Sequence, residues 1–343
     1  MTLLKRITIN DVAQAAGVSV STVSLVLSGK GRISSATGER VNAAVEKLGF
    51  VRNQQAVALR GGYSGGIGVI VHDLCHPFYA ELTAGLAEEL EQNGRTLTLL
   101  QDGGDAGRLQ QCVDRLIAQG VDGIVIVGAS GGWVELRERA AQSGVALLFA
   151  SGASHPDEVA MVRPDNQQAA RLITEHLIKK GHQRIAWLGG HSASLTRAER
   201  LGGFCATLLQ YGLPFHSQWI IECESTQRRA AEEVANLLHR NPTITAVVCH
   251  NSTIAMGAWF GLLRAGRQSG EDSFASYYDH QVALAAFADV PEARLDDVPV
   301  TWVTTPAREI GRSAAQRILH SQPEERRTAS NVIVPSRLVR HQG

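Results

Sequence analysis

Few residues in this sequence have the types and spacing that chemistry at a site requires. His72 and His76 flank the tripeptide DLC, but no third metal ligand stands at a suitable spacing. The five cysteines are scattered and form no CxxC pair, so we expect five reduced thiols in the core. No GxGxxG or GxxxxGK(S/T) motif follows an expected strand, and no nucleophile and base stand out as a pair. We therefore expect no metal, no cofactor and no enzyme, with an α/β enzyme as the weaker alternative.

A stretch rich in hydroxyls, SVSTVSLVLSG, runs from Ser19 to Gly29 and contains no Lys, Arg, Asn or Gln. Apolar residues before it recur with the spacing of a helix that Thr8 can cap, and Gly17 breaks that pattern. We expect a second helix from Ser19 to Gly29 and a third from Ser34 to Leu48. Three short helices with a glycine-containing turn between the first two predict a helix-turn-helix head, whose second helix normally enters the major groove of DNA.

From Ile67 onward, apolar runs alternate with amphipathic segments in two successive series of roughly equal length. This alternation predicts parallel sheets covered by helices on both faces. The 343 residues suit two or three domains, and 44% hydrophobic with 19% charged residues is typical of a globular protein. We expect two lobes, with a ligand bound between them at the carboxyl ends of the strands.

The charges divide unevenly along the chain although the formal net charge is zero. Residues 1–62 hold eight Lys or Arg and three Asp or Glu, whereas the remainder holds 25 and 30. A basic head on an acidic body suggests that only the head meets a polyanion. Because no apolar run reaches the ~18 residues of a membrane span and MTLLKRITIND lacks the apolar core of a signal peptide, we expect a cytoplasmic protein without a membrane partner.

Several motifs are similar to those of the LacI/GalR family of bacterial repressors, and together they extend over nearly the whole chain. They include TINDVAQAAGVSVSTVSLVLSGKGRIS, IGVIVHDLCHPFYAEL, VRPDN, HLIKKGHQRIAWLGG, LTRAERLGGF, AVVCHNSTIAMGA and TTPAREIG. The resemblance implies a dimeric, ligand-responsive repressor of a carbohydrate operon, maltose-related, with an all-α head and two doubly wound parallel-sheet lobes of the type 1 periplasmic-binding-protein fold. No leucine heptad follows Arg337, so we expect no tetramerisation zipper at the tail.

The same resemblance implies the domain boundaries. Residues 1–51 form the DNA-binding head, residues 52–66 the hinge helix and linker, and residues 67–343 the body that binds effector and dimerises. The chain crosses between the lobes three times, with the first lobe at about 67–162 and 298–319 and the second at about 163–297 and 320–343. The segment 267–281 is interpreted as a surface insertion or, with less support, as a dimer or cleft contact.

In this family the bases are contacted from positions that correspond to Val20, Ser21 and Leu25. Leu25 departs from the arginine that many members carry there, so it offers an apolar contact to a thymine methyl, or else it packs against the third helix. In the hinge, Leu59 is the wedge between central base pairs, unless the hinge is a plain linker helix. The full set implied to contact DNA is Thr8, Ser19, Val20, Ser21, Thr22, Ser24, Leu25, Ser28, Ser34, Asn53, Ala56, Leu59 and Arg60.

For the effector, Arg200 matches the family arginine that reaches between the lobes, and its planar guanidinium can fork onto a carboxylate, a phosphate or paired hydroxyls. Ser252 replaces the aspartate that usually follows Asn251, which weakens any direct transfer of a free-sugar site. Arg200 or Asp289 in a salt bridge between the lobes, and Phe78 in the core, are the alternatives. The implied effector residues are Asp73, Phe78, Tyr79, Asp165, Thr196, Arg200, Asn251 and Asp289.

The expected partners are thus double-stranded operator DNA, a small-molecule effector that is a sugar or sugar derivative, and a second copy of the chain. Twofold symmetry predicts a pseudo-palindromic operator. A two-lobed sugar-binding or transport protein without DNA function is the other alternative, although it would need export and has no use for a basic head.

Overall fold

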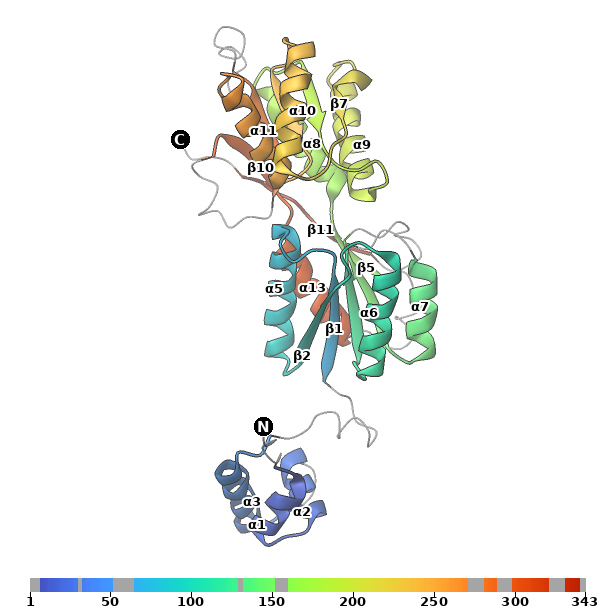
Figure 1. Cartoon of the computed structure of the whole chain (residues 1–343), viewed down its shortest axis with the longest axis vertical. Helices are drawn as coiled ribbons and strands as arrows, with labels where there is room; N and C mark the ends of the chain where they lie inside the picture. Colours follow the sequence, from blue (N-terminus) through green and yellow to red (C-terminus); the bar gives the residue numbers. More distant parts are fainter. Residues whose placement is uncertain are drawn as a thin grey trace, which may run out of the picture. The chain divides into compact units, whose positions relative to one another are not determined.

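The computed structural model describes residues 7–29, 33–51, 65–128, 132–151, 160–270, 281–288, 298–320 and 331–339. The chain divides into two compact units, Met1–Ser64 and Gly65–Gly343 (Figure 1). Each unit has a hydrophobic core of its own.

Three helices form the first unit, namely α1 (Ile9–Ala16), α2 (Val20–Ser28) and α3 (Ser35–Leu48). Each begins after a side chain that accepts a backbone N–H of the first turn, and these caps are Thr8, Ser19 and Ser34. Each helix ends at a glycine in the left-handed conformation, where an L side chain would be strained. Val12, Val23 and Val41 are fully buried at the centre of this unit, so the helical spacing in the sequence marks the core faces correctly.

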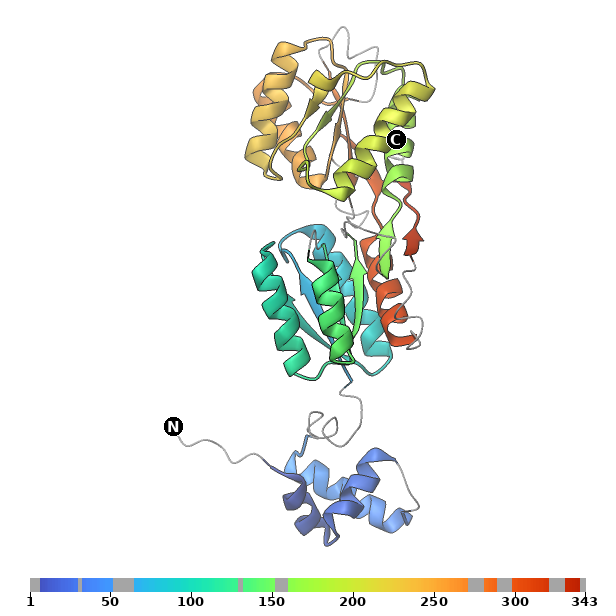
Figure 2. The ribbon, with the colours of Figure 1, turned by 90° about the vertical axis from the view of Figure 1, so that its right-hand side faces the viewer.

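The second unit contains two six-stranded sheets, each covered by helices on both faces (Figure 2). The first sheet is entirely parallel and has the order β11-β5-β4-β3-β1-β2. Helices α5 (Pro77–Gln92) and α13 (Ala307–His320) pack on one face, and α6 (Ala106–Ala118) and α7 (Trp133–Gln142) on the other. The strands are β1 (Gly66–Val71), β2 (Thr96–Gln101), β3 (Gly123–Val127), β4 (Ala146–Ala150), β5 (Met161–Pro164) and β11 (Asn331–Val334).

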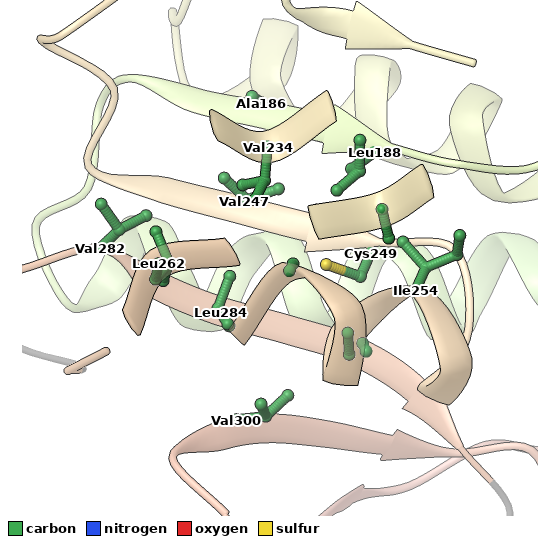
Figure 3. Close-up of a cluster of buried hydrophobic side chains, with 14 of the residues drawn as sticks. Ala186, Leu188, Val234, Val247, Cys249, Ile254, Leu262, Val282, Leu284 and Val300 are labelled. Carbon is green, nitrogen blue, oxygen red and sulfur yellow. The ribbon is translucent and has the colours of Figure 1, made fainter. Parts of the chain in front are cut away.

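The second sheet has the order β12-β10-β9-β8-β6-β7 and is parallel except for β12. Helices α8 (Asn166–Lys179) and α9 (Leu195–Gln210) cover one face, and α10 (Gln227–Arg240) and α11 (Ser252–Arg264) the other. Figure 3 shows the core under α10 and α11, where Val234 and Leu262 meet strand residues such as Val247 and Leu284. The strands are β6 (Ile185–Leu188), β7 (Ile220–Ile221), β8 (Ala246–Cys249), β9 (Ala283–Ala288), β10 (Val300–Thr304) and β12 (Leu338–Val339).

The chain passes between the two sheets three times, after β5, after β10 and after β11. The number agrees with expectation, but the expected limits of the lobes were wrong at two places. Strand β10 was expected in the first lobe and pairs with β9 in the second sheet, while β11 was expected in the second lobe and pairs with β5 in the first. Both strands are short and apolar, so their own sequence does not specify which sheet they join.

Two smaller expectations also differ from the structure. The apolar run WIIEC (219–223), one of those expected to form strands, follows a 3₁₀ turn (Ser217–Trp219) and contains only the two-residue strand β7. All five cysteines are free thiols, but Cys75 is exposed rather than in the core. Of the expected insertion, residues 271–280 lie outside the described part of the chain.

Within the described ranges, no single helix has the length and apolar composition that crossing a membrane requires. Helices α1 and α2 meet that test only when joined, and the pair is bent by 102°.

Gly202 and Gly203 are neighbours in α9 with opposite surroundings. A Cβ at Gly203 would lie 2.6 Å from the carbonyl oxygen of Gln167 on α8, whereas a Cβ at Gly202 would meet nothing within 4 Å. We expect Gly203→Ala to lower the free energy of unfolding by about 1 to 3 kcal/mol through overpacking. Gly202→Ala should raise it by about 0.5 to 1 kcal/mol, because alanine favours helix more than glycine does. Urea unfolding of the full chain measures both, and equal stability of the two variants would contradict the close contact between the helices.

Candidate functional site

The amino end of α2 carries a cluster of hydroxyl groups. Ser19 caps the helix, and its Oγ lies 3.2 Å from the backbone nitrogen of Thr22, 2.7 Å from Oγ of Ser21 and 2.8 Å from Oγ1 of Thr22. A helix amino end combines free N–H groups with the positive end of the helix dipole. This end of α2 can therefore hold a phosphate oxygen although it bears no charged side chain.

The face of α2 that the sequence assigns to base contacts is open to solvent. Ser21 is exposed, and Leu25 is exposed to 41% and does not belong to the buried cluster of the head. This exposure favours the predicted contact with bases over the alternative in which Leu25 packs against the third helix. Val20 differs from these two, because it is partly buried and packs against the core of the head. Of the three residues assigned to base contacts, Ser21 and Leu25 are thus the ones open to a partner.

Other hydroxyls that were predicted to contact DNA have local hydrogen bonds. Oγ1 of Thr8 lies 2.6 Å from Oδ2 of Asp11 in a capping box, and Oγ of Ser34 lies 2.9 Å from Oγ1 of Thr37. Oγ of Ser28 donates to the carbonyl of Leu25 at 3.1 Å, and Ser24 is partly buried. Thr8 and Ser34 stand, like Ser19, at helix amino ends, so three such ends belong to this unit. The hinge residues Asn53, Ala56, Leu59 and Arg60 lie outside the described residues.

In the body, the carboxyl ends of the strands in the first sheet carry an aromatic and histidine cluster. Tyr79 packs with its ring 5.1 Å from that of His76 and 5.7 Å from that of Phe78. Both Phe78 and Tyr79 also pack against the core of this lobe, which supports the alternative of a core role for Phe78. Nδ1 of His72 lies 3.5 Å from the buried carboxylate of Asp102. Burial is the main cause that raises the pKa of Tyr79, with Asp102 adding to it.

The corresponding end of the second sheet is centred on Arg200, which is buried in α9. Its Nε donates to Oδ1 of Asn166 at 3.0 Å, its Nη1 donates to the carbonyl of His250 at 2.7 Å, and its guanidinium lies 4.4 Å from the centre of the Phe287 ring. Burial lowers the pKa of Arg200 to about 9. Thr196, four residues earlier in the same helix, is partly buried.

Three other residues that were predicted to contact the effector accept hydrogen bonds from the protein backbone. Asp165 caps α8 by accepting from the backbone of Gln168 at 2.9 Å, and Asn251 caps α11 by accepting from the backbone of Ile254 at 2.9 Å. Oδ1 of Asp73 accepts from the backbone of Cys75 at 2.9 Å. The caps fix where α8 and α11 begin. Because one side-chain oxygen of each of these three residues already accepts a backbone hydrogen bond, fewer acceptor atoms remain for a ligand. Asp289 lies outside the described residues.

Sequence reasoning missed the two residues that contact Arg200 most closely. Asn166 begins α8, directly after the first crossing between the sheets, and His250 follows β8. Nδ1 of His250 is buried and has no hydrogen-bond partner among the described residues. The signal was available for His250, because it is polar and stands at the carboxyl end of a buried parallel strand.

Comparison with known families accounts for both units. The family described as "Bacterial regulatory proteins, lacI family" matches residues 8–53, and "Periplasmic binding proteins and sugar binding domain of LacI family" matches residues 64–342. The chain belongs to the LacI family. The resemblance inferred from the motifs is thereby confirmed, as is the expected fold of a helix-turn-helix head with a two-lobed parallel α/β body.

Individual relatives of this LacI-family chain include regulators of known name. It is 62% identical over 339 residues to the maltose regulon regulatory protein MalI of Escherichia coli strain K12, with 99% of each chain covered. It is 28% identical to the transcriptional repressor PurR of Photobacterium profundum, with 91% of each chain covered.

Two solved structures also resemble this LacI-family chain. The transcriptional regulator CelR in complex with cellobiose has a TM-score of 0.70 and 25% identity, and the match covers 98% of this chain and 100% of that one. The lac repressor dimer bound to operator and the anti-inducer ONPF has a TM-score of 0.84 and 24% identity, covering 98% and 99%. The second likeness establishes the fold.

Proposed function

We propose that this LacI-family chain is a transcriptional repressor of a carbohydrate operon, maltose-related, in the cytoplasm. The observation that carries the proposal is the 62% identity over 99% of both chains to the maltose regulon regulatory protein of Escherichia coli. The protein binds its operator as a homodimer, and twofold symmetry gives the operator two half-sites about 10 bp apart.

In the head, readout of bases and attachment to phosphates are carried by different groups. Leu25 and Ser21 face the base edges, and their exposure on α2 supports this role. The helix amino ends at Thr8, Ser19 and Ser34 hold phosphates of the backbone. Leu59 of the hinge is the proposed wedge in the minor groove, with Asn53 and Ala56 on the same hinge helix.

In the body, a small molecule bound between the lobes regulates the repressor. Arg200 and Thr196 contact it from α9, and Phe78 and Tyr79 contact it from α5. Asp73, Asp165, Asn251 and Asp289 complete the proposed set. Such a ligand changes operator affinity only by the ratio of its affinities for the two arrangements of the lobes.

A gel-shift experiment tests the repressor function directly. Duplexes from around the gene of this protein are mixed with the full chain and with residues 61–343 alone, at one fixed salt concentration. We expect the full chain to retard a specific duplex in the presence of excess random DNA, and the truncated chain to retard none. Binding by the truncated chain, or no binding by the full chain, would refute the proposal.

A further inference from the structure

No carboxylate among the described residues forms a direct ion pair with the buried guanidinium of Arg200, although the charge of the adjacent Glu199 partly offsets the effect of burial on its pKa. Its hydrogen bonds go to an amide oxygen and to a backbone carbonyl, both of which are neutral. The nearest acid in the sequence, Glu199, is engaged by Arg163 and by Nδ2 of Asn166. An unpaired buried cation is costly, because the interior replaces little of its lost hydration. A ligand that supplies negative charge there would remove this cost.

A second cation and a histidine lie beside Arg200. Arg197 is one turn earlier in α9, and its Nε donates to the carbonyl of Gly189 at 3.4 Å. Gly190 has a φ of +82°, and a Cβ placed on it would lie 2.8 Å from Cδ of Arg197 and 3.0 Å from Cγ of His250. The side chains of Arg197 and His250 therefore both lie close to Gly190. Nδ1 of His250 is enclosed and unpaired among the described residues, so it can donate to an acceptor if it is protonated.

A histidine of the first lobe completes the group. Burial is the main cause that lowers the pKa of His76, and the charge of Arg200 lowers it further, while Asp73 opposes this. The pKa of His250 also lies well below its ordinary value. Burial is the largest cause, and the charges of Arg200 and Arg197 and the neighbouring His76 lower this pKa further. Nδ1 of His76 accepts from the backbone of Phe78 at 3.3 Å, which leaves the proton of the neutral ring on Nε2. The positive charge thus comes from the arginines of the second lobe, and the neutral ring of His76 adds an N–H donor from the first.

We propose that the small molecule bound between the lobes carries an anionic group, a phosphate or a carboxylate, held by Arg197, Arg200 and His250. The inference rests on the proposed function, because it specifies the chemical class of ligand for the same site. The amino end of α9, capped by Ser194, places its dipole beside Arg197 in the first turn of the helix.

Binding of matched ligand pairs to the full chain tests the charge requirement. Glucose is compared with glucose 6-phosphate and gluconate, maltose with maltose 6-phosphate, and inorganic phosphate serves as the smallest anion. Sodium chloride equalises the ionic strength, and melting temperatures and calorimetric titrations are recorded. We expect at least one anionic probe to raise the melting temperature saturably and to bind about tenfold or more tightly than its neutral counterpart, as charge-assisted hydrogen bonds do.

Variants then locate the bound anion. Arg200→Met and Arg197→Met should each weaken the anionic probe by about tenfold to a hundredfold, and His250→Phe by about tenfold. Arg200→Lys and His250→Phe keep the test decisive if Arg200→Met does not fold. Arg228→Met, which removes an exposed arginine of α10, is the matched control and should bind as the wild type does.

Several results would overturn the inference. They are a neutral sugar that binds as tightly as its anionic partner, an anion that binds Arg200→Met and Arg200→Lys as it binds the wild type, and no response to any anionic probe. Anion binding that appears only in Asp289→Asn would also overturn it, because Asp289 would then be the counter-ion of Arg200. The gel shift without effector decides the repressor function separately. A neutral sugar lost in Arg200→Met would refute the anionic class and leave the proposed function intact.

Discussion

Replacing Leu25 by arginine is expected to change which operator the protein prefers. The side chain is exposed on α2, so an arginine there would reach base edges without displacing the core of the head. Arginine binds O6 and N7 of guanine in a bidentate manner, and each such contact is worth about 1 to 3 kcal/mol of discrimination. Duplexes selected from a random pool by Leu25→Arg should therefore gain a guanine in each half-site. The wild type should select a thymine there, because its leucine contacts the methyl group.

The control variant must distinguish recognition of bases by residue 25 from the general effect of an added positive charge on DNA binding. Asn42→Arg adds the same charge to an exposed position of α3, where it should strengthen binding to all sequences and steepen the dependence on salt. Competitive gel shifts on both selected duplexes measure the preference of each variant. If Leu25→Arg and Asn42→Arg tighten binding to every duplex by the same factor, Leu25 does not face the bases.

Removing the carboxylate of Glu199 is expected to destabilise the body by about 3 kcal/mol. Glu199 on α9 pairs with Arg163 on β5 and accepts a hydrogen bond from Nδ2 of Asn166 at 2.8 Å. The pair therefore links strand β5 of the first sheet to a helix that covers the second sheet. The side chains of Arg163 and Glu199 are only 18% and 14% exposed. The variant Glu199→Ala leaves the guanidinium of Arg163 enclosed without its partner, and that loss costs more than the pair contributes.

An exposed pair provides the comparison. Arg229 and Glu232 on α10 have Nη1 and Oε2 2.9 Å apart, but both side chains are well exposed. Water screens such a pair, so Glu232→Ala should unfold at the same urea concentration as the wild type. Tryptophan fluorescence follows the transition in both variants. An unfolding midpoint of Glu199→Ala that matches that of Glu232→Ala would show that the link between the sheets contributes nothing to stability.

The features that the sequence predicted well are those determined by neighbouring residues. Thr8 was recognised as a cap, and Ser19 and Ser34 as the starts of helices, because a hydroxyl before an apolar helical pattern needs only its own first turn. The strand β10 was assigned to the wrong lobe because its pairing with β9 depends on contacts that an apolar run does not encode. Local chemistry was therefore readable, whereas strand partnership was not.

The candidate site shows the same division. Asp165 and Asn251 were predicted to contact ligand, yet an Asp or Asn after a strand serves equally well to cap the next helix, as both do here. The burial of Arg200 and its bond to the carbonyl of His250 arise from the packing of α9 against the end of β8, which no spacing of residues reveals. The residue types of the site could therefore be predicted from the sequence, whereas their burial and hydrogen-bond partners depend on how the helices and strands pack.

The return of the chain to the first sheet has a consequence for synthesis on the ribosome. Strands β1 to β5 emerge early, but α13, which covers their shared core, and the edge strand β11 follow only after most of the second lobe. At about 5 to 20 residues per second, the stretch from Pro164 to Val334 takes roughly 10 to 30 s to translate. Until α13 emerges within this stretch, the apolar face that it buries lacks this cover on the nascent chain. The first lobe, although it begins the body, can complete its fold only after most of the second lobe has been translated.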